Sequence, residues 1–250
     1  MPETQHTNNP IAALDSLSAE MSLLKHPFYQ QWTAGTLPPE RLRNYAVQYY
    51  RHVAAFPRYL SGLHARCDNL QTRQSLLENL IDEERGSENH PELWLRFAAA
   101  LGLVREEVLA ADPLPATKAL VETFIHLSRT APLSSGLAAL YVYESQVAEV
   151  AAVKIEGLKR FYGIADEDGV KFFTVHREAD LHHARAIAEL IQRHTGSEQD
   201  NHLLLKAGGT ALKAVWRMLD CVCEQIPDIH LAARGGTVFP DKGPRRKSDS

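Results

Sequence analysis

The sequence has little that would mark a secreted, membrane-spanning or nucleic-acid-binding protein. Its 250 residues include three cysteines, Cys67, Cys221 and Cys223, which are too few and too poorly spaced for a disulfide framework or a thiolate zinc site. No apolar run approaches the length of a membrane span, and Met1 to Pro10 is polar, unlike a signal peptide. Lys and Arg number 27 against 31 Asp and Glu, and this net charge of −4 argues against nucleic acid as a partner. We therefore expect a cytoplasmic protein with reduced cysteines and with neither a membrane nor a nucleic-acid partner.

The sequence also lacks the signals of β-structure, because no alternating β-branched runs lie between hairpin turns. Its hydrophobic periodicity is helical almost throughout, and a short helical turn is expected from His26 to Ala34. Longer helices are predicted over 11–25, 38–67, 72–85, 91–102, 116–130, 136–161, 169–195 and 198–226. The pattern predicts a single compact all-α bundle of seven or more helices over residues 11–230, between a flexible N-terminal tail (1–10) and a flexible basic C-terminal tail (231–250).

Proline and glycine support these boundaries. The pair Pro38 and Pro39 suits a helix start, and Pro57 should kink or divide the long helix that contains it. Four glycines are expected at helix ends: Gly86, Gly102, Gly163 and Gly196.

Histidine is abundant, with 12 in the chain, and acidic residues stand near some of them. The first unusual acidic residue is Glu144, which a helical projection sets at the centre of an otherwise apolar face. Glu149 and Glu156 of the same helix point to the other side. A buried carboxylate is costly unless it is neutralised, paired or metal-bound, so Glu144 either pairs with a core Arg or hydroxyl or binds a metal.

The second acidic site lies in a stripe of His176, Asp180 and His183, whose i, i+4, i+7 spacing puts them on one helix face. Phe172 and Phe173 flank that stripe, which argues against a simple solvated surface. Two imidazoles and a carboxylate are ligands for a hard to borderline metal ion. The alternative is a histidine satisfied by Asp180.

The third segment runs from Asn79 to Pro91 and contains Glu83, Glu84 and His90. Gly86 is expected to end one helix there and Asn89 to start the next, so that His90 would reach inward from a helix start. Periodicity alone does not choose between Glu83 and Glu84. With one glutamate of that pair, the candidate ligands from the three segments are two Glu, one Asp and three His. Six such ligands can hold two metal ions as in di-iron carboxylate bundles, although the Glu-x-x-His spacing of those bundles is absent. Such ligands suit iron or manganese and therefore O₂ chemistry.

Several runs resemble a known superfamily. The run from His26 to Leu37, the Tyr45-Ala-Val-Gln-Tyr49-Tyr segment and Phe56-Pro-Arg-Tyr resemble the haem-oxygenase-like helical proteins that include TenA and pyrroloquinoline-quinone synthase C. The Asn79–Pro91 segment, Tyr143-Glu-Ser and the His176 stripe are similar to one branch, the CADD-like proteins that make para-aminobenzoate for folate biosynthesis. The similarity runs from about Leu23 to Ile226.

This resemblance implies a ligand set for a dinuclear centre, Fe/Fe or Mn/Fe: Glu83, His90, Glu144, His176, Asp180 and His183. It thereby selects Glu83 over Glu84. TenA-like thiaminases carry a nucleophilic cysteine on the equivalent helix, whereas in this chain that helix carries Glu144 and has no Cys nearby, which disfavours thiamin hydrolysis. Synthase C lacks the metal set.

The resemblance also implies an unusual reaction. CADD-like proteins consume one of their own tyrosine side chains as the aromatic ring, using O₂ and an external reductant, and a lysine is implicated as amino donor. The matching positions are Tyr29 and Lys154. From the residues alone, Tyr29 also suits core packing and Lys154 a snorkelling surface position, whereas a cavity-facing Lys154 would be held neutral by desolvation. Tyr141, one turn before Glu144, is a candidate proton donor or alternate radical site.

Two alternatives remain open at the level of the sequence. One is a di-iron oxidase that acts on an external small molecule, either a PqqC-like oxidase or an oxidative decarboxylase of a fatty or amino acid. The other is a non-enzymatic helical interaction module. A homodimer is expected in each case because related helical proteins often dimerise.

Overall fold

The computed structural model describes residues 9–195 and 197–224, and within residues 178–182 it describes the backbone only. Among these residues it contains ten α-helices, one short 3₁₀ turn and no strand. This confirms the predicted all-α class. The elements are α1 (Pro10–Glu20), η1 (Leu23–Lys25), α2 (Pro27–Ala34), α3 (Pro39–Arg66), α4 (Leu70–Glu84), α5 (His90–Ala100), α6 (Arg105–Ala110), α7 (Pro115–Arg129), α8 (Leu133–Phe161), α9 (Glu167–His194) and α10 (Glu198–Glu224).

Most boundaries agree with the predicted ones to within about three residues, and two regions differ. The first helix ends at Glu20, and Leu23–Lys25 forms a separate 3₁₀ turn where a continuous helix to residue 25 was expected. The short helix α6 was not predicted, because only Val108 within it is buried and six residues are too few to display a periodicity. The predicted tails fall almost entirely on residues outside the description and stay predictions.

Local capping explains where the helices that carry the site begin. The imidazole of His26 caps α2 by accepting the Phe28 backbone N–H at 3.0 Å, and its Nε2 lies 3.0 Å from Asp220. Asn89 caps α5 by accepting the Glu92 N–H at 3.0 Å. Three of the predicted helix-end glycines (Gly86, Gly102 and Gly163) have positive φ, as does Gly35. The fourth predicted glycine, Gly196, lies outside the described residues.

Helix α3 continues through Pro57 and is not divided there. Proline removes one hydrogen bond from the helix interior. Buried neighbours on both sides, Phe56 and Tyr59, pack into the core and hold the two halves in one helix.

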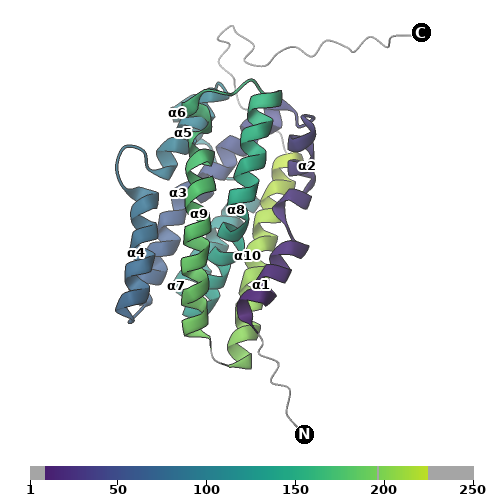
Figure 1. Cartoon of the computed structure of the whole chain (residues 1–250). Coiled ribbons are helices and arrows are strands. Elements are labelled where there is room, and N and C mark those ends of the chain that lie inside the picture. The colour runs from purple at the N-terminus through teal and green to yellow at the C-terminus, as the bar shows by residue number, and fades with distance from the viewer. Residues whose placement is uncertain (1–8, 196, 225–250) are drawn as a thin grey trace, which may run out of the picture.

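The long helices run side by side (Figure 1), with α8 packed against both α9 and α10, and α3 packed against α4, α5 and α7. Helix α8 is therefore central, and one of the helices that it packs against, α9, also carries predicted ligands. None of the described helices combines the length and apolar character needed to cross a membrane.

Candidate metal centre and adjoining pocket

Three predicted ligands from three different helices come together in the interior. Glu83, near the end of α4, His90, the first residue of α5, and His176, in the middle of α9, offer ligand atoms that all lie within 4.8 Å of one another. Their exposed fractions are 4%, 2% and 8%. The neighbouring Glu84 is exposed, so of the two glutamates only Glu83 lies in this buried cluster.

The local sequence explains why this cluster forms. Helix α4 ends at Glu84, and Asn89 is the N-cap of the next helix, α5. His90 therefore points inward from the first turn of α5. Its Nδ1 lies 2.7 Å from Glu83 Oε2. The imidazoles of His90 and His176 have ring centroids 4.2 Å apart.

His176 is held in the form that binds a metal. Its Nδ1 lies 2.7 Å from the carbonyl oxygen of Phe172, so an Nδ1–H donates there and Nε2 keeps its lone pair for an ion. Burial, followed by the nearby His90, holds the pKa of His176 well below its ordinary value. The imidazole is therefore neutral at physiological pH, as a ligand must be.

Glu144 is buried, as predicted, with 3% of its surface exposed. It comes from α8 and lines one small hollow together with Glu83 and His176; Tyr143 and Phe172 are also part of that lining. Glu144 Oε1 accepts a hydrogen bond from the Asn79 side-chain amide at 3.4 Å.

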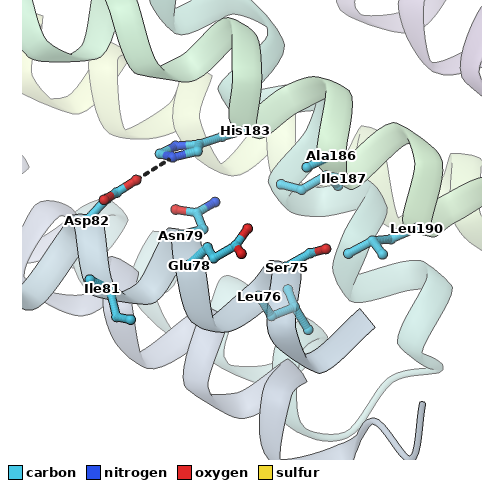
Figure 2. A pocket seen from close by; sticks show the side chains of 10 residues that line it. All are labelled: Ser75, Leu76, Glu78, Asn79, Ile81, Asp82, His183, Ala186, Ile187 and Leu190. Carbon is cyan, nitrogen blue, oxygen red and sulfur yellow. Dashed lines mark hydrogen bonds and ion pairs between the residues drawn. The ribbon is translucent and has the colours of Figure 1, made fainter. Parts of the chain in front are cut away.

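The remaining two predicted ligands lie on α9, one turn apart. His183 is buried, at 6% exposed, and its Nε2 lies 3.1 Å from Asp82 Oδ2 of α4 (Figure 2). The side chain of Asp180 lies outside the described residues, so its role as a ligand stays a prediction.

The donor set fits a transition-metal ion. Two buried carboxylates and two buried imidazoles converge from four helices, and burying such carboxylates without compensation is costly. Carboxylate and imidazole donors without thiolates suit iron or manganese rather than a structural zinc site.

A second hollow adjoins the first and contains both predicted catalytic residues, Tyr29 and Lys154. The two hollows share three lining residues, Tyr143, Phe172 and His176. The predicted ligand His176 therefore lines the hollow that contains Tyr29 and Lys154.

Lys154 does not snorkel to solvent. It is 4% exposed, and its Nζ donates a hydrogen bond to the Tyr45 hydroxyl at 2.7 Å. Burial lowers the pKa of Lys154 to about 7, so a large fraction of the amine is neutral near physiological pH. A neutral amine is the nucleophilic form.

Tyr29 is 1% exposed and packs against Phe28 and Trp32, as the core-packing interpretation expected. It also faces the pocket, where its hydroxyl lies 3.5 Å from that of Tyr45. Burial raises the pKa of Tyr29, so the phenol is protonated at physiological pH. The Lys154 Nζ lies 5.5 Å from the centre of the Tyr29 ring.

Tyr141 is placed elsewhere. Its hydroxyl donates to Asp15 of α1 at 2.7 Å, and it does not line either hollow. Its involvement in proton or radical transfer stays a prediction. Tyr143, adjacent to Glu144, lines both hollows and is hydrogen-bonded to Tyr49.

Two contacting residues were missed by sequence reasoning. Asn79 supports Glu144, and Asp82 contacts His183. Their only signal in the sequence was spacing: Asn79, Asp82 and Glu83 lie at positions i, i+3 and i+4 of α4. That spacing is also common among solvated residues.

The chain is similar to known proteins over most of its length. The family model of an iron-containing redox enzyme matches residues 43–216. A 4-aminobenzoate synthase of Nitrosomonas europaea is 42% identical over 227 residues, covering 87% of this chain and 92% of the relative. A 4-aminobenzoate synthase of Chlamydia muridarum is 41% identical over 222 residues, covering 89% and 93%.

Among solved structures, a TenA homologue from Pseudomonas syringae pv. tomato superposes with a TM-score of 0.73 at 21% identity. The superposition covers 86% of this chain and 91% of that chain. This likeness concerns the fold alone, and it agrees with the predicted haem-oxygenase-like bundle.

Proposed function

We propose that this chain, which belongs to the 4-aminobenzoate synthase family of iron-containing redox enzymes, forms para-aminobenzoate for folate biosynthesis from its own Tyr29 side chain. The enzyme is an oxidoreductase with a metal centre. The proposal extends this to a dinuclear centre, Fe/Fe or Mn/Fe, that uses O₂ and an external reductant. Its proposed ligands are Glu83, His90, Glu144, His176, Asp180 and His183.

The observation that carries the proposal is the shared wall between the two hollows. A centre held by His176 adjoins the pocket in which Tyr29 and Lys154 face each other. When bound, a reduced dinuclear centre supplies an O₂-derived oxidant strong enough to cleave the Cα–Cβ bond of a tyrosine. The side chains hold that ring in place and keep water out.

Lys154 is positioned to serve as amino donor at the correct end of the ring. In para-aminobenzoate the nitrogen replaces the phenol oxygen, so the amine must approach the hydroxyl end of Tyr29. Tyr45 links the two groups, since its hydroxyl accepts from Lys154 Nζ at 2.7 Å and lies 3.5 Å from the Tyr29 hydroxyl. Tyr45 is thus placed to orient the amine and to exchange a proton with it.

The proposal is tested by intact-protein mass spectrometry after single turnover with Fe(II), O₂ and reductant. Wild-type protein should lose the mass of one tyrosine side chain together with the nitrogen of Lys154, and should release one para-aminobenzoate per chain at most. Tyr29→Phe should abolish both changes because the phenol is absent. Tyr59→Phe is the matched control, since Tyr59 is equally buried but lines neither hollow, and it should behave as wild type.

Several turnovers without any mass change in the protein would contradict self-sacrifice and favour an oxidase that acts on an external substrate. Product formation by Tyr29→Phe would exclude Tyr29 as the ring source.

We also propose that the protein is a homodimer. Leu70 and Leu77, spaced by two turns on α4, are 64% and 42% exposed, which supports an apolar contact surface. Sedimentation analysis of wild type and Leu77→Lys would test this: the variant should shift toward the monomer.

A further inference from the structure

A surface groove lies between α4 and α9 (Figure 2), and the proposed ligand His183 is part of its lining. It has a volume of about 330 Å³. Its described lining residues are Ser75, Leu76, Glu78, Asn79, Ile81, Asp82, His183, Ala186, Ile187 and Leu190. We propose that this groove is the path by which divalent metal ions reach the centre, with Asp82 and Asn79 holding the incoming ion beside His183. This inference rests on the metal centre of the proposed function.

The buried centre requires such a path. Its clustered ligands Glu83, His90 and His176 are at most 8% exposed, so an ion reaches them only through an opening between helices. The groove has room for an ion with its inner water shell, since six waters occupy about 180 Å³ in the liquid.

The charge of the groove suits a cation. Glu78 and Asp82 are both exposed at its mouth, and the described lining contains no Lys or Arg. A cleft lined by charge of one sign concentrates ions of the opposite sign and accelerates their association.

The interior of the groove offers ligand atoms beyond these two carboxylates. Asn79 is 5% exposed, and its Oδ1 has no hydrogen-bond donor among the residues that the structure describes. In Figure 2 its carboxamide projects from α4 toward α9, below His183. A buried carbonyl oxygen without a donor is costly, and an ion in the groove would relieve that cost.

Asp82 and Asn79 also connect the groove to the proposed ligands. Asp82 Oδ2 lies 3.1 Å from His183 Nε2, and the Asn79 amide donates to Glu144 Oε1 at 3.4 Å. Carboxylate, carbonyl and imidazole donors together suit a first-row divalent ion. An ion beside Asp82 and Asn79 therefore lies next to His183, and Asn79 contacts Glu144 directly.

The test is the rate of Mn(II) uptake by full-length, metal-free protein. It is followed after rapid mixing by the loss of the electron paramagnetic resonance signal of free aqueous Mn(II). At low ionic strength Asp82→Asn should slow uptake at least about threefold, while its amide keeps a hydrogen-bond acceptor for His183. The difference should shrink at higher salt, because the Debye length falls from about 30 Å at 0.01 M to about 8 Å at 0.15 M.

Glu84→Gln is the matched control. It removes the same charge from an exposed position two residues away that does not line the groove, and it should keep the wild-type rate. Equal uptake rates for wild type, Asp82→Asn and Glu84→Gln would overturn the proposal.

A second variant acts without any change of charge. Ala186→Leu narrows the groove and should slow uptake while the final amount of bound Mn(II) stays at the wild-type value. A wild-type rate in this variant would overturn the proposal as well. If wild-type protein binds no Mn(II) at equilibrium, the metal centre of the proposed function is wrong too; if it binds Mn(II) and every variant matches it, only the path is wrong.

Discussion

Lys154 illustrates at the scale of a single residue how the fold changes the chemistry of a side chain. An exposed lysine is a solvated cation, whereas Lys154 is enclosed by aromatic rings, including those of Tyr45, Tyr49 and Phe173 within 5.1 to 5.3 Å of its Nζ. Burial alone lowers its pKa to about 7. The protein gains a neutral amine next to a tyrosine and loses stability, because the unfolded chain binds a proton that the folded one releases.

Because burying Lys154 lowers the free energy of unfolding, we expect Lys154→Met to be more stable than wild type. In the unfolded chain the lysine titrates near 10.5 and in the folded chain near 7, so below pH 7 the penalty is complete and between pH 7 and 10.5 it declines to zero. Urea unfolding should show a gain of roughly 2–5 kcal/mol at pH 6, at about 1.36 kcal/mol per pK unit, and almost none near pH 10.5.

The matched control is Lys159→Met on the same helix. Lys159 is exposed, and its substitution should change the free energy of unfolding by no more than about 0.5 kcal/mol at either pH. An equal gain in both variants would show that burial of Lys154 is not the cause.

At the scale of the elements, the contact between α2 and α8 positions the tyrosine proposed as ring source. Helix α2 carries Tyr29 and Trp32, and Gly157 of α8 lets the Trp32 indole approach the α8 backbone closely. A Cβ built at Gly157 would overlap that indole ring. The glycine is therefore needed for close packing of the two helices rather than for a special backbone angle.

Gly157→Ala is expected to lower the free energy of unfolding by about 1–3 kcal/mol through overpacking, despite the better helix propensity of alanine. It should also reduce para-aminobenzoate formation by displacing α2. Gly209→Ala on α10 is the control, since its Cβ would meet only Leu17 at 3.8 Å and should stabilise by about 0.5–1 kcal/mol. Urea denaturation of both variants decides the matter, and a stabilised Gly157→Ala would contradict the packing argument.

At the scale of the whole molecule, the proposed metal ligands come from four different helices. Glu83, His90, Glu144 and His176 come from α4, α5, α8 and α9. Without an ion, these side chains bring polar groups together in the interior, which destabilises the folded chain. An ion that binds only the folded chain should therefore raise the free energy of unfolding.

Mn(II) or anaerobic Fe(II) should therefore raise the melting temperature. An ion at 100 times its Kd adds about 2.7 kcal/mol, which corresponds to roughly 5–10 °C for a chain of this size. Glu144→Gln should lose much of this rise, whereas Glu84→Gln should keep it. Differential scanning calorimetry measures the shift, and an equal rise in wild type and Glu144→Gln would argue against Glu144 as a ligand.

The residues alone predicted the helical class, most helix boundaries, the inward position of His90 and the burial of Glu144. Each of these depends on local periodicity or capping, which neighbouring residues determine. The choice of Glu83 over Glu84 came from family resemblance, because two adjacent residues at a helix end differ only by rotation about the axis. The short helix α6 and the contacts of Asn79 and Asp82 were not predictable, since many solvated residues share their spacing.

By itself, then, the sequence determined which side chains with metal-binding and redox chemistry are available and which of them lie on apolar helix faces. The tertiary structure decided which of them meet. Tyr29 and Lys154 are 125 residues apart, and only the packing of α2 against α8 brings them into one pocket beside His176. Periodicity describes the orientation of a residue about its own helix, whereas contacts between helices depend on how side chains from several helices fill the same space.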